Sequence, residues 1–325
     1  MTTMNINRVL VTGATGFIGS ALVKSLNSSS NFEVRGAVRG KTLESDASSI
    51  TVGDLTQFTD WAPALDGIDV VVHSAARVHI QNDSASDSLD EFRKVNTFGT
   101  LNLARQAEEA GVSRFIFLST IGVNGTRTTD RRYDADSDVA PQSPYAISKH
   151  EAELGLLEIS RHSRMKVAVI RPPLVYGPDA PGNWGRMVHW LWRGTPLPLG
   201  AIHNKRSYVG LDNLVDLVTT CIDHPAATNQ IFLVSDGEDI STTELLHRVS
   251  ESLGKKARLF PVPAWLLKLG AYAIGKQESV HRLCGSLQID ISKTRELLNW
   301  NPSVRLQDGL QRSAEHFLTS LSMQS

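Results

Sequence analysis

An α/β protein, with a doubly wound parallel sheet and a smaller mixed α/β domain, is the fold class that the sequence predicts. Short apolar runs alternate with segments of helical periodicity over the first 171 residues. A glycine-rich turn directly follows the first apolar run, and clustered prolines and glycines over 172–182 end the alternation. Strands that alternate with helices build a parallel sheet covered on both faces, so these observations favour this class.

Strands and helices follow one another in regular order in this first part. The run Asp69–His73 is almost wholly apolar, as expected for a strand buried on both faces of a sheet. We predict further strands at 8–12, 32–38, 50–52, 114–119 and 166–170. We predict helices at 17–26, 87–110 and 145–162.

Three glycines lie between the first strand and the first helix: Gly13, Gly16 and Gly19. In the Rossmann fold such glycines permit the tight turn, the approach of backbone to a pyrophosphate, and close packing of helix on strand. The start of the helix then directs N–H groups and a partial positive charge at the phosphates. We predict an NADP or NAD site that includes these glycines with Thr15, Phe17 and Ile18.

Composition changes after Arg171, where the elements become shorter and more mixed. We therefore predict a dinucleotide-binding domain over 1–171 and a mainly substrate-binding domain over 172–325. A segment near 209–235 is expected to return to the first domain.

Bulk composition narrows the classes of function. The 325 residues include 33 Lys and Arg against 34 Asp and Glu, so there is no overall basic field to hold nucleic acid. The two cysteines, Cys221 and Cys284, form no CxxC pair and predict no thiolate metal site. We therefore expect a small-molecule substrate, no metal and no nucleic-acid partner.

Membrane signals are weak along the sequence. There is no apolar signal region at the N-terminus, and no run reaches the roughly 18 apolar residues that a spanning helix needs. These observations favour a cytoplasmic protein without a membrane span. For the short apolar segment Trp265–Ile274 we favour packing in the core or between domains, with contact to a membrane surface as the alternative.

The end of the second strand bears on the choice of cofactor. An acidic residue usually accepts a hydrogen bond from the ribose 2′-hydroxyl of NAD at this place, but here the sequence runs Val34-Arg-Gly-Ala-Val-Arg39. The guanidinium of Arg39 can pair with a 2′-phosphate, which a carboxylate would repel. We therefore favour NADP over NAD, and the alternative is that Arg39 is a solvated loop residue and NAD binds.

Tyr145 and Lys149 share one face of a predicted helix that opens directly after Pro144. A free tyrosine titrates near a pKa of about 10, too high for an efficient base at neutral pH. The Lys149 ammonium, with the positive nicotinamide ring of an oxidised cofactor, is expected to favour the phenolate. We predict that Tyr145 transfers a proton and that Lys149 supports it and holds the nicotinamide ribose.

These motifs resemble the extended short-chain dehydrogenase/reductase family, in its NAD-dependent epimerase/dehydratase branch, over essentially the whole chain. The GxxGxxG turn and the YxxxK pair carry the resemblance. It implies that Thr120 hydrogen-bonds the reacting oxygen, and the adjacent Ser119 could share this role. It also implies further residues of the cofactor site, namely Asp54, Leu55, Ser74, Ala75, Ala76, Asn96 and Pro172.

Later segments resemble the substrate side of the same branch. Arg171–Pro178 matches its RxxxVYGP segment, and Asp290–Pro302 matches its closing segment. The resemblance implies that Arg206 contacts the diphosphate of a sugar nucleotide, with Asn183 and Arg282 nearby. An ion pair that ties the domains together is the alternative role for Arg206.

Several functions stay open at this point. The resemblance implies hydride transfer at C4 of a nucleotide-activated sugar, which we expect to be a UDP-linked N-acetylated or 6-deoxy hexosamine. The position of Arg39 favours a 4-keto reductase, and a UDP-sugar 4-epimerase with bound NAD is the alternative. A 4,6-dehydratase is disfavoured because Ile121-Gly122, and not an Asp-Glu pair, follows Thr120. Further alternatives are a reductase of non-nucleotide ketones and a redox-sensing binding protein.

The resemblance also implies a homodimer. The two helices of each chain that would form its interface are Leu89–Ala107 and Glu151–Ile159.

Overall fold

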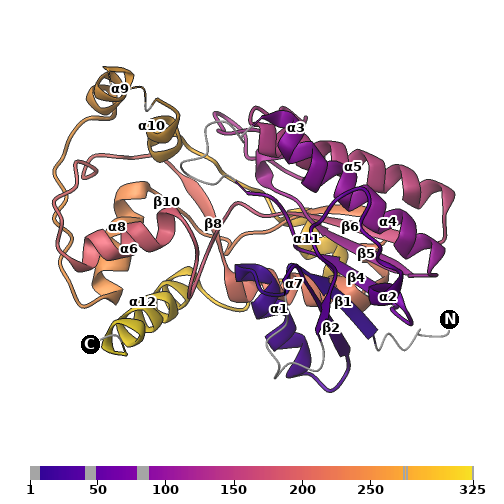
Figure 1. Ribbon diagram of the computed structural model, residues 1–325. Helices are drawn as coiled ribbons and strands as arrows, with labels where there is room; N and C mark the ends of the chain where they lie inside the picture. The colour runs from indigo at the N-terminus through magenta and orange to yellow at the C-terminus, as the bar shows by residue number, and fades with distance from the viewer. Residues whose placement is uncertain (1–7, 41–48, 79–87, 274, 276, 324–325) are drawn as a thin grey trace.

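Seven parallel strands form the larger of two sheets in the computed structural model, which describes residues 8–40, 49–78, 88–273, 275 and 277–323 (Figure 1). The strands lie in the order β3-β2-β1-β4-β5-β6-β9. The chain winds outward in both directions from β1 and β4, and ligands bind at the carboxyl ends of strands at such a switch point. The strands are β1 (Arg8–Thr12), β2 (Glu33–Val38), β3 (Ser49–Thr51), β4 (Val70–His73), β5 (Arg114–Leu118), β6 (Lys166–Arg171) and β9 (Gln230–Leu233).

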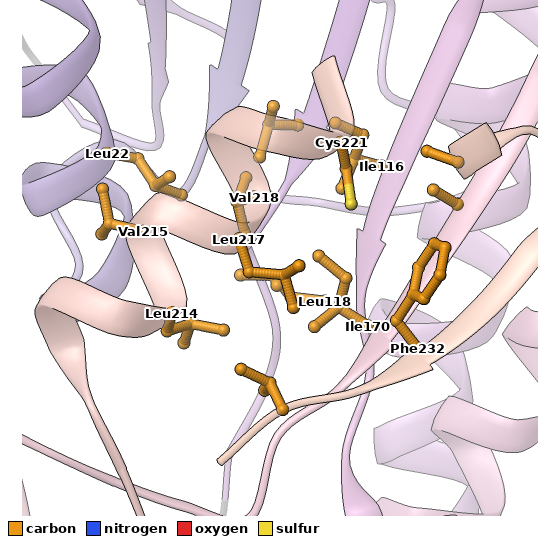
Figure 2. Packing of buried hydrophobic residues seen from close by; sticks show 14 of the residues in the cluster. Leu22, Ile116, Leu118, Ile170, Leu214, Val215, Leu217, Val218, Cys221 and Phe232 are labelled. Atoms are coloured by element: carbon orange, nitrogen blue, oxygen red, sulfur yellow. The ribbon is translucent and has the colours of Figure 1, made fainter. Parts of the chain in front are cut away.

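Helices cover both faces of this sheet. On one face, α1 and α7 bury Leu22, Leu214 and Leu217 against apolar side chains of β5, β6 and β9 (Figure 2). On the other face, α2, α4 and α5 bury Leu65, Leu103 and others. These helices are α1 (Phe17–Asn27), α2 (Ala62–Leu65), α4 (Thr100–Glu109), α5 (Pro144–His162) and α7 (Leu211–Asp223). The doubly wound parallel sheet that the sequence predicts is confirmed.

The helix predicted over 87–110 is a continuous helical run with a wider segment inside it; its predicted first residue lies outside the described residues. α3 (Leu89–Phe92) passes into a π-helical segment, η1 (Arg93–Gly99), and α4 follows without a break. Ser88 caps the start by accepting a backbone N–H hydrogen bond. Single π-helical segments are rare and frequently occur at functional sites. This one carries Asn96, which is fully buried.

A second, smaller sheet has mixed strand directions. β8 pairs in parallel with β7 and antiparallel with β10. α6, α8 and α12 pack around it and enclose a separate apolar cluster that includes Trp184, Leu246 and Leu310. The elements are β7 (Leu174–Tyr176), β8 (Arg206–Gly210), β10 (Asp239–Ile240), α6 (Asn183–Trp192), α8 (Thr242–Ser252) and α12 (Leu306–Ser322). Further described elements are the helices α9 (Ala264–Ala273), α10 (Gln277–Cys284) and α11 (Ser292–Leu298) and the short 3-10 turn η3 (Pro225–Ala227).

The chain crosses more than once between the two sheets. After β8 ends at Gly210 in the smaller sheet, α7 and β9 return to the larger one. α11 also packs against β9, and α12 then returns to the smaller sheet.

A buried carboxylate connects the crossing segments. Asp236 accepts hydrogen bonds from Tyr176 Oη (2.7 Å), the N–H of Gly210 (2.9 Å) and Asn213 Nδ2 (2.7 Å). Tyr176 Oη also lies 3.2 Å from the carbonyl oxygen of Leu306, at the start of α12. Burial raises the pKa of both Asp236 and the Tyr176 phenol. β7, α7 and α12 are therefore held at one polar point inside the protein.

The apolar segment that begins at Trp265 does not lie in the core or between domains, as we favoured from the sequence. It forms α9, at the tip of the smaller part of the molecule (Figure 1), and Trp265, Leu269 and Tyr272 are exposed. Packing in the core or between domains is therefore wrong for most of this helix. Among the described residues, no helix is long and apolar enough to cross a membrane.

Candidate active site

The glycine turn forms a tight cradle between β1 and α1. Gly13 has φ +67°, and a Cβ there would lie 2.9 Å from the Cα of Ala75, so only glycine fits without strain. The N–H of Gly16 donates to the carbonyl of Gly13 (2.8 Å), and α1 begins at Phe17. Thr15 and Gly16 are exposed, while Gly19 is buried against the turn. Such a helix start, open to solvent and with glycines at both ends of the turn, fits a dinucleotide pyrophosphate.

The loop after β4 supports this turn from below. Ser74 Oγ donates to the carbonyl of Thr12 (2.6 Å), and the N–H of Ala75 donates to Thr12 Oγ1 (3.3 Å). The predicted residues Ser74 and Ala75 thus lie directly under the turn, with Ala76 next in the chain. The hydroxyl of Ser74 is bound to the backbone, so its role there is to fix the turn.

Arg39 and Asp54 lie side by side at the ends of β2 and β3. Arg39 Nε is 3.9 Å from Asp54 Oδ1, and both side chains are largely exposed, 83% and 79%. An ion pair this exposed contributes little stability, so both groups remain accessible to a ligand. Leu55 follows, half-buried, and a Cβ on Gly99 would lie 2.9 Å from its Cγ. The η1 segment therefore packs closely on the loop predicted to contact adenine.

Asn96 connects the β4 loop to α5. Its amide pairs twice with the backbone of Arg77, accepting from the N–H (2.8 Å) and donating to the carbonyl (3.0 Å). Its Nδ2 also lies 3.1 Å from the hydroxyl of Ser148, the residue before Lys149. Asn96 is fully buried, so these contacts position the loop and α5 rather than reach a ligand directly.

Tyr145 and Lys149 come from the first turns of α5. Ser143 caps the helix by accepting from the N–H of Ala146 (3.2 Å), and Pro144 occupies its first turn. Tyr145 is half-buried, with its ring edge-on to Phe92 at 6.2 Å between centroids. Lys149 is almost completely buried, and its Nζ lies 4.0 Å from the centre of the Phe117 ring. Tyr145 and Lys149, four residues apart, therefore share one face of the first turns of α5.

Burial dominates the protonation of this pair. It raises the pKa of Tyr145 to about 12 and lowers the pKa of Lys149 to about 7, a lowering that the Glu153 carboxylate partly opposes. The protein's own groups therefore do not produce the phenolate expected from the sequence. The Phe117 ring face favours the charged ammonium. A further positive charge beside Tyr145 is needed to bring its pKa down.

A neutral histidine lies behind Lys149 and was not predicted. His73 stacks on Phe117, with ring centroids 5.8 Å apart and planes 16° from parallel. Its two ring nitrogens contact the hydroxyls of Thr12 (2.7 Å) and Thr100 (2.9 Å). Burial, and next the charge of Lys149, lower the pKa of His73 well below its usual value. The only signal in the sequence was a polar residue ending an apolar strand.

Thr120 and Ser119 end β5 with different environments. Thr120 is extended and half-buried, and its Oγ1 accepts from the N–H of Gly122 (3.1 Å), which opens the 3-10 turn η2 (Ile121–Val123). That turn packs on the start of α5, since a Cβ on Gly122 would lie 3.4 Å from the Cβ of Ala146. The hydroxyl of Ser119, in contrast, is buried and donates to Glu153. Of the two hydroxyls, Thr120 is the one free to orient a substrate oxygen.

A buried ion pair beneath these residues was also missed from the sequence. Arg171 binds Glu153 through Nε (3.0 Å) and Nη2 (2.6 Å), and its Nη1 donates to Asn124 Oδ1 (3.0 Å). Burial acts to raise the pKa of Glu153, but the nearby His150 ring, 3.7 Å away at Nδ1, and hydrogen bonds from Arg171 and Ser119 outweigh it and hold the pKa low. The pair fixes α5 against the ends of β5 and β6. Pro172, also predicted at the site, accepts from the N–H of Ile121 (2.9 Å).

Arg206 and Arg282 meet at the edge of the smaller sheet. Arg206 Nη1 donates to the carbonyls of Arg282 (2.7 Å) and Gly285 (3.0 Å). Burial lowers the pKa of Arg206, and the charge of Arg282 adds to this effect. Arg282 itself is exposed on α10. Arg206 Nη1 is thus bonded to backbone carbonyls rather than to the carboxylate of an ion pair, and the charge of Arg282 lies close enough to affect its pKa.

Asn183 lies on a different helix from Arg282. It is the first residue of α6, exposed, and its side chain bonds Arg186 one turn further on. Of the three residues predicted to bind substrate, the structure brings Arg206 and Arg282 into contact and places Asn183 on another helix.

Comparison with known proteins defines the class. Residues 9–235 match the model of the NAD dependent epimerase/dehydratase family, and the chain belongs to this family. It is an enzyme of the short-chain dehydrogenase/reductase type, as the glycine turn and the Tyr145–Lys149 pair predicted.

Individual relatives resemble the chain along nearly all of its length. A UDP-glucose 4-epimerase of Vibrio cholerae is 46% identical over 312 residues, which cover 95% of each chain. An N-acetyl-alpha-D-glucosaminyl-diphospho-ditrans,octacis-undecaprenol 4-epimerase of Escherichia coli O157:H7 is 28% identical over 332 residues, 96% of each chain. The crystal structure of a UDP-glucuronic acid 4-epimerase from Bacillus cereus with NAD superimposes with a TM-score of 0.78 at 22% identity, over 96% of this chain and 99% of that one. At that identity, the structural match concerns the fold.

Proposed function

We propose that this chain interconverts the C4 epimers of a UDP-linked sugar, with UDP-glucose and UDP-galactose as the first pair to test. The observation that carries the proposal is the Vibrio cholerae relative, a UDP-glucose 4-epimerase that is 46% identical over 95% of both chains. The position of Arg39 favoured a 4-keto reductase, and the epimerase was the alternative. The similarity over the whole chain now favours the epimerase.

The residues at the switch point fit the cofactor of such an enzyme. The backbone N–H groups at the start of α1 would bind the pyrophosphate, Asp54 and Leu55 the adenine end, and Lys149 the nicotinamide ribose. NAD bound there supplies the means to take the hydrogen from C4 and to give it back. Arg39 then stays a solvated residue beside Asp54, as its 83% exposure permits.

Tyr145 is proposed to move the proton of the C4 hydroxyl at its Oη. Its pKa of about 12 keeps the phenol protonated until positive charge gathers beside it. Lys149, with a pKa of about 7, sits at the midpoint of its titration near neutral pH and can supply part of this charge. Thr120 Oγ1 would orient the oxygen that loses and regains the proton.

The arginine pair explains how one site could serve both epimers. Arg206 and Arg282 would hold the diphosphate through charge-assisted hydrogen bonds. A substrate held at its diphosphate can turn its sugar ring and present either face of C4 to the same cofactor. Inversion at C4 requires such a turn between removal and return of the hydrogen.

A 4-keto reductase is the second candidate, and one observation favours it. Arg39 stands exposed at the end of β2, where no carboxylate would repel the 2′-phosphate of NADP. Such a reductase would take its cofactor from solution at every turnover.

Analysis of the bound nucleotide separates the two candidates. The purified chain is denatured and the released nucleotide identified, and the apo form is titrated with NADH and NADPH, with Arg39→Asp as the matched variant. Retained NAD, with an affinity that Arg39→Asp does not lower, supports the epimerase. An empty protein that prefers NADPH, and loses this preference in Arg39→Asp, supports the reductase.

A homodimer is proposed through the helices named from the sequence. Phe98 on η1 and Leu154 on α5 are exposed apolar side chains on these helices, which would be covered in such an interface. Light scattering of the purified chain, compared with the variant Phe98→Asp/Leu154→Asp, tests it. A wild-type dimer that this variant dissociates supports the proposal, and a wild-type monomer overturns it.

A further inference from the structure

The α9 helix exposes aromatic and aliphatic side chains on an outer tip of the molecule. Trp265, Leu269 and Tyr272 are 67%, 61% and 73% exposed, Leu266 is also exposed on the helix, and Phe260 is exposed in the segment that leads to it. Large apolar side chains that gather on one surface usually mark a contact with a partner or a membrane. We call these five residues the α9 patch.

The helix is held to the rest of the protein along one narrow edge. Among the described side chains of α9, only Ala271 is buried, at 4% exposure, and Leu267 is half-buried. α10 is the neighbour against which α9 packs, and Lys268 lies close enough to Cys284 at the end of α10 to lower the pKa of that thiol, against the larger effect of burial. The remaining surface of α9 faces away from the protein (Figure 1).

The sequence around the patch carries charge of one sign. From Ser252 to Gln277 there is no Asp or Glu, whereas the whole chain has 34 acidic against 33 basic residues. The basic residues of this stretch are Lys255, Lys256, Arg258, Lys268 and Lys276. Lys268 is exposed on α9 itself, and Arg258 is exposed on the strand-like segment that leads to it.

We propose that the α9 patch docks this protein on the surface of an anionic lipid membrane. Tryptophan and tyrosine favour the interface between lipid and water, where an apolar body and a polar tip are both satisfied. A short helix without the length to span a bilayer can lie in that interface with its apolar side chains inserted. Lysines beside it add attraction to anionic headgroups while their stems stay in contact with the apolar layer.

The charge pattern favours a membrane over a second copy of this chain. A twofold interface brings the same patch of both copies together. The two Lys268 ammonium groups and the other basic residues would then face each other without acidic partners from this stretch. An anionic surface, in contrast, complements both the apolar and the basic part of the patch.

Vesicle flotation of the full chain tests the proposal. The vesicles are phosphatidylcholine alone, or phosphatidylcholine with one quarter phosphatidylglycerol. We expect binding to the anionic vesicles that weakens as salt is raised, and at least tenfold weaker binding to neutral ones. The variant Trp265→Ser/Leu269→Ser/Tyr272→Ser should lose at least tenfold in partitioning, and Lys268→Glu should lose several-fold with its fold intact.

The matched control is Phe58→Ser, an aromatic side chain that is 85% exposed in the loop before α2. It should bind vesicles as the wild type does. Equal binding of the triple variant and the wild type, or no binding of the wild type to anionic vesicles, would overturn the proposal. So would a wild-type dimer, seen by light scattering, that the triple substitution makes monomeric without any vesicle binding. Turnover of UDP-sugars plays no part in these measurements, so failure of the proposed function leaves their outcome unaffected.

Discussion

At the scale of one residue, the burial of Lys149 lowers the stability of the folded protein. Its ammonium is buried against Phe117, and His73, which stacks on the same ring, is held neutral. Burial lowers the pKa of Lys149 to about 7 from an ordinary value of 10.5. Because the unfolded chain binds the proton more tightly, the charged lysine opposes folding below pH 7, and the cost disappears as the pH rises toward 10.5.

Replacing this lysine should therefore stabilise the protein while removing its activity. We expect Lys149→Met to raise the free energy of unfolding at pH 6 to 7 by roughly 2–4 kcal/mol, allowing for the stabilising Phe117 ring. The gain should shrink toward pH 10. Urea unfolding across this range measures it, with Lys24→Met on the exposed surface of α1 as the control. A gain of the same size at every pH would contradict the account.

Removal of the Tyr145 hydroxyl tests the proton transfer itself. Tyr145→Phe keeps the ring against Phe92, so the fold and nucleotide binding should be unchanged. Turnover should fall by about 10²–10⁴, the usual contribution of a positioned acid or base. Tyr272→Phe, exposed on α9, is the control and should keep full turnover. Retention of more than a tenth of wild-type turnover in Tyr145→Phe would show that another group moves the proton.

At the scale of elements, α5 depends on the ion pair between Glu153 and Arg171, 1% and 3% exposed. Glu153→Gln should lower the free energy of unfolding by about 3–5 kcal/mol, because it leaves the Arg171 charge buried without its partner. The loss should be full at pH 7, should begin to shrink as the pH falls below the ordinary glutamate pKa of 4.5, and should disappear only below the lowered pKa of Glu153 in the folded protein. Denaturant unfolding at pH 7 and pH 4 measures both effects.

Two comparisons make this prediction specific. Glu158→Gln, on the exposed side of the same helix, should change the stability far less, because its ion pair is screened by solvent. The double variant Glu153→Gln/Arg171→Met should recover part of the stability lost in the single one. If the single and double variants were equally unstable, the buried charge would not be the cause.

Sequence periodicity predicted the regular elements well, but not the change of helix type within the helix over 87–110. The helix over 87–110 was predicted as one uniform helix, since a change from four- to five-residue hydrogen bonding leaves the apolar pattern of Phe92, Leu103 and Ala107 almost unaltered. Asn96 could be named only by resemblance, and its pairing with the Arg77 backbone depends on that π-helical segment. The Ser119–Glu153 contact spans 34 residues and has no local signal.

At the scale of the whole molecule, much of the larger sheet followed from the sequence because β1, β4, β5 and β6 each contain an uninterrupted run of apolar residues. The smaller part did not, because its strands are short and its chain crosses back through α7, β9 and α11. The exposed position of α9 could not be predicted either, since apolar composition alone does not distinguish a core helix from one at a surface.

We expect loss of the hydrogen bond between Tyr176 and Asp236 to lower the stability of the protein as a whole, because this contact joins segments of both sheets. Tyr176→Phe removes the hydroxyl that joins β7 to Asp236 and to the first residue of α12, with no change in ring packing. Loss of a buried hydrogen bond of this kind should cost about 1–3 kcal/mol. Thermal unfolding measures it, with Tyr133→Phe, whose hydroxyl bonds an exposed carbonyl, as the milder control. An unchanged melting temperature would mean that Asp236 is satisfied without Tyr176.

The central claim is that one molecule of substrate loses and regains hydrogen at C4 within the same site. Its most direct test is to incubate the purified chain, with no added cofactor, with UDP-glucose deuterated at C4 and to follow the products by NMR. For a 4-epimerase we expect UDP-galactose that keeps the deuterium at C4. No epimerisation without added NADPH, or a product whose deuterium has been lost to the solvent, would contradict it.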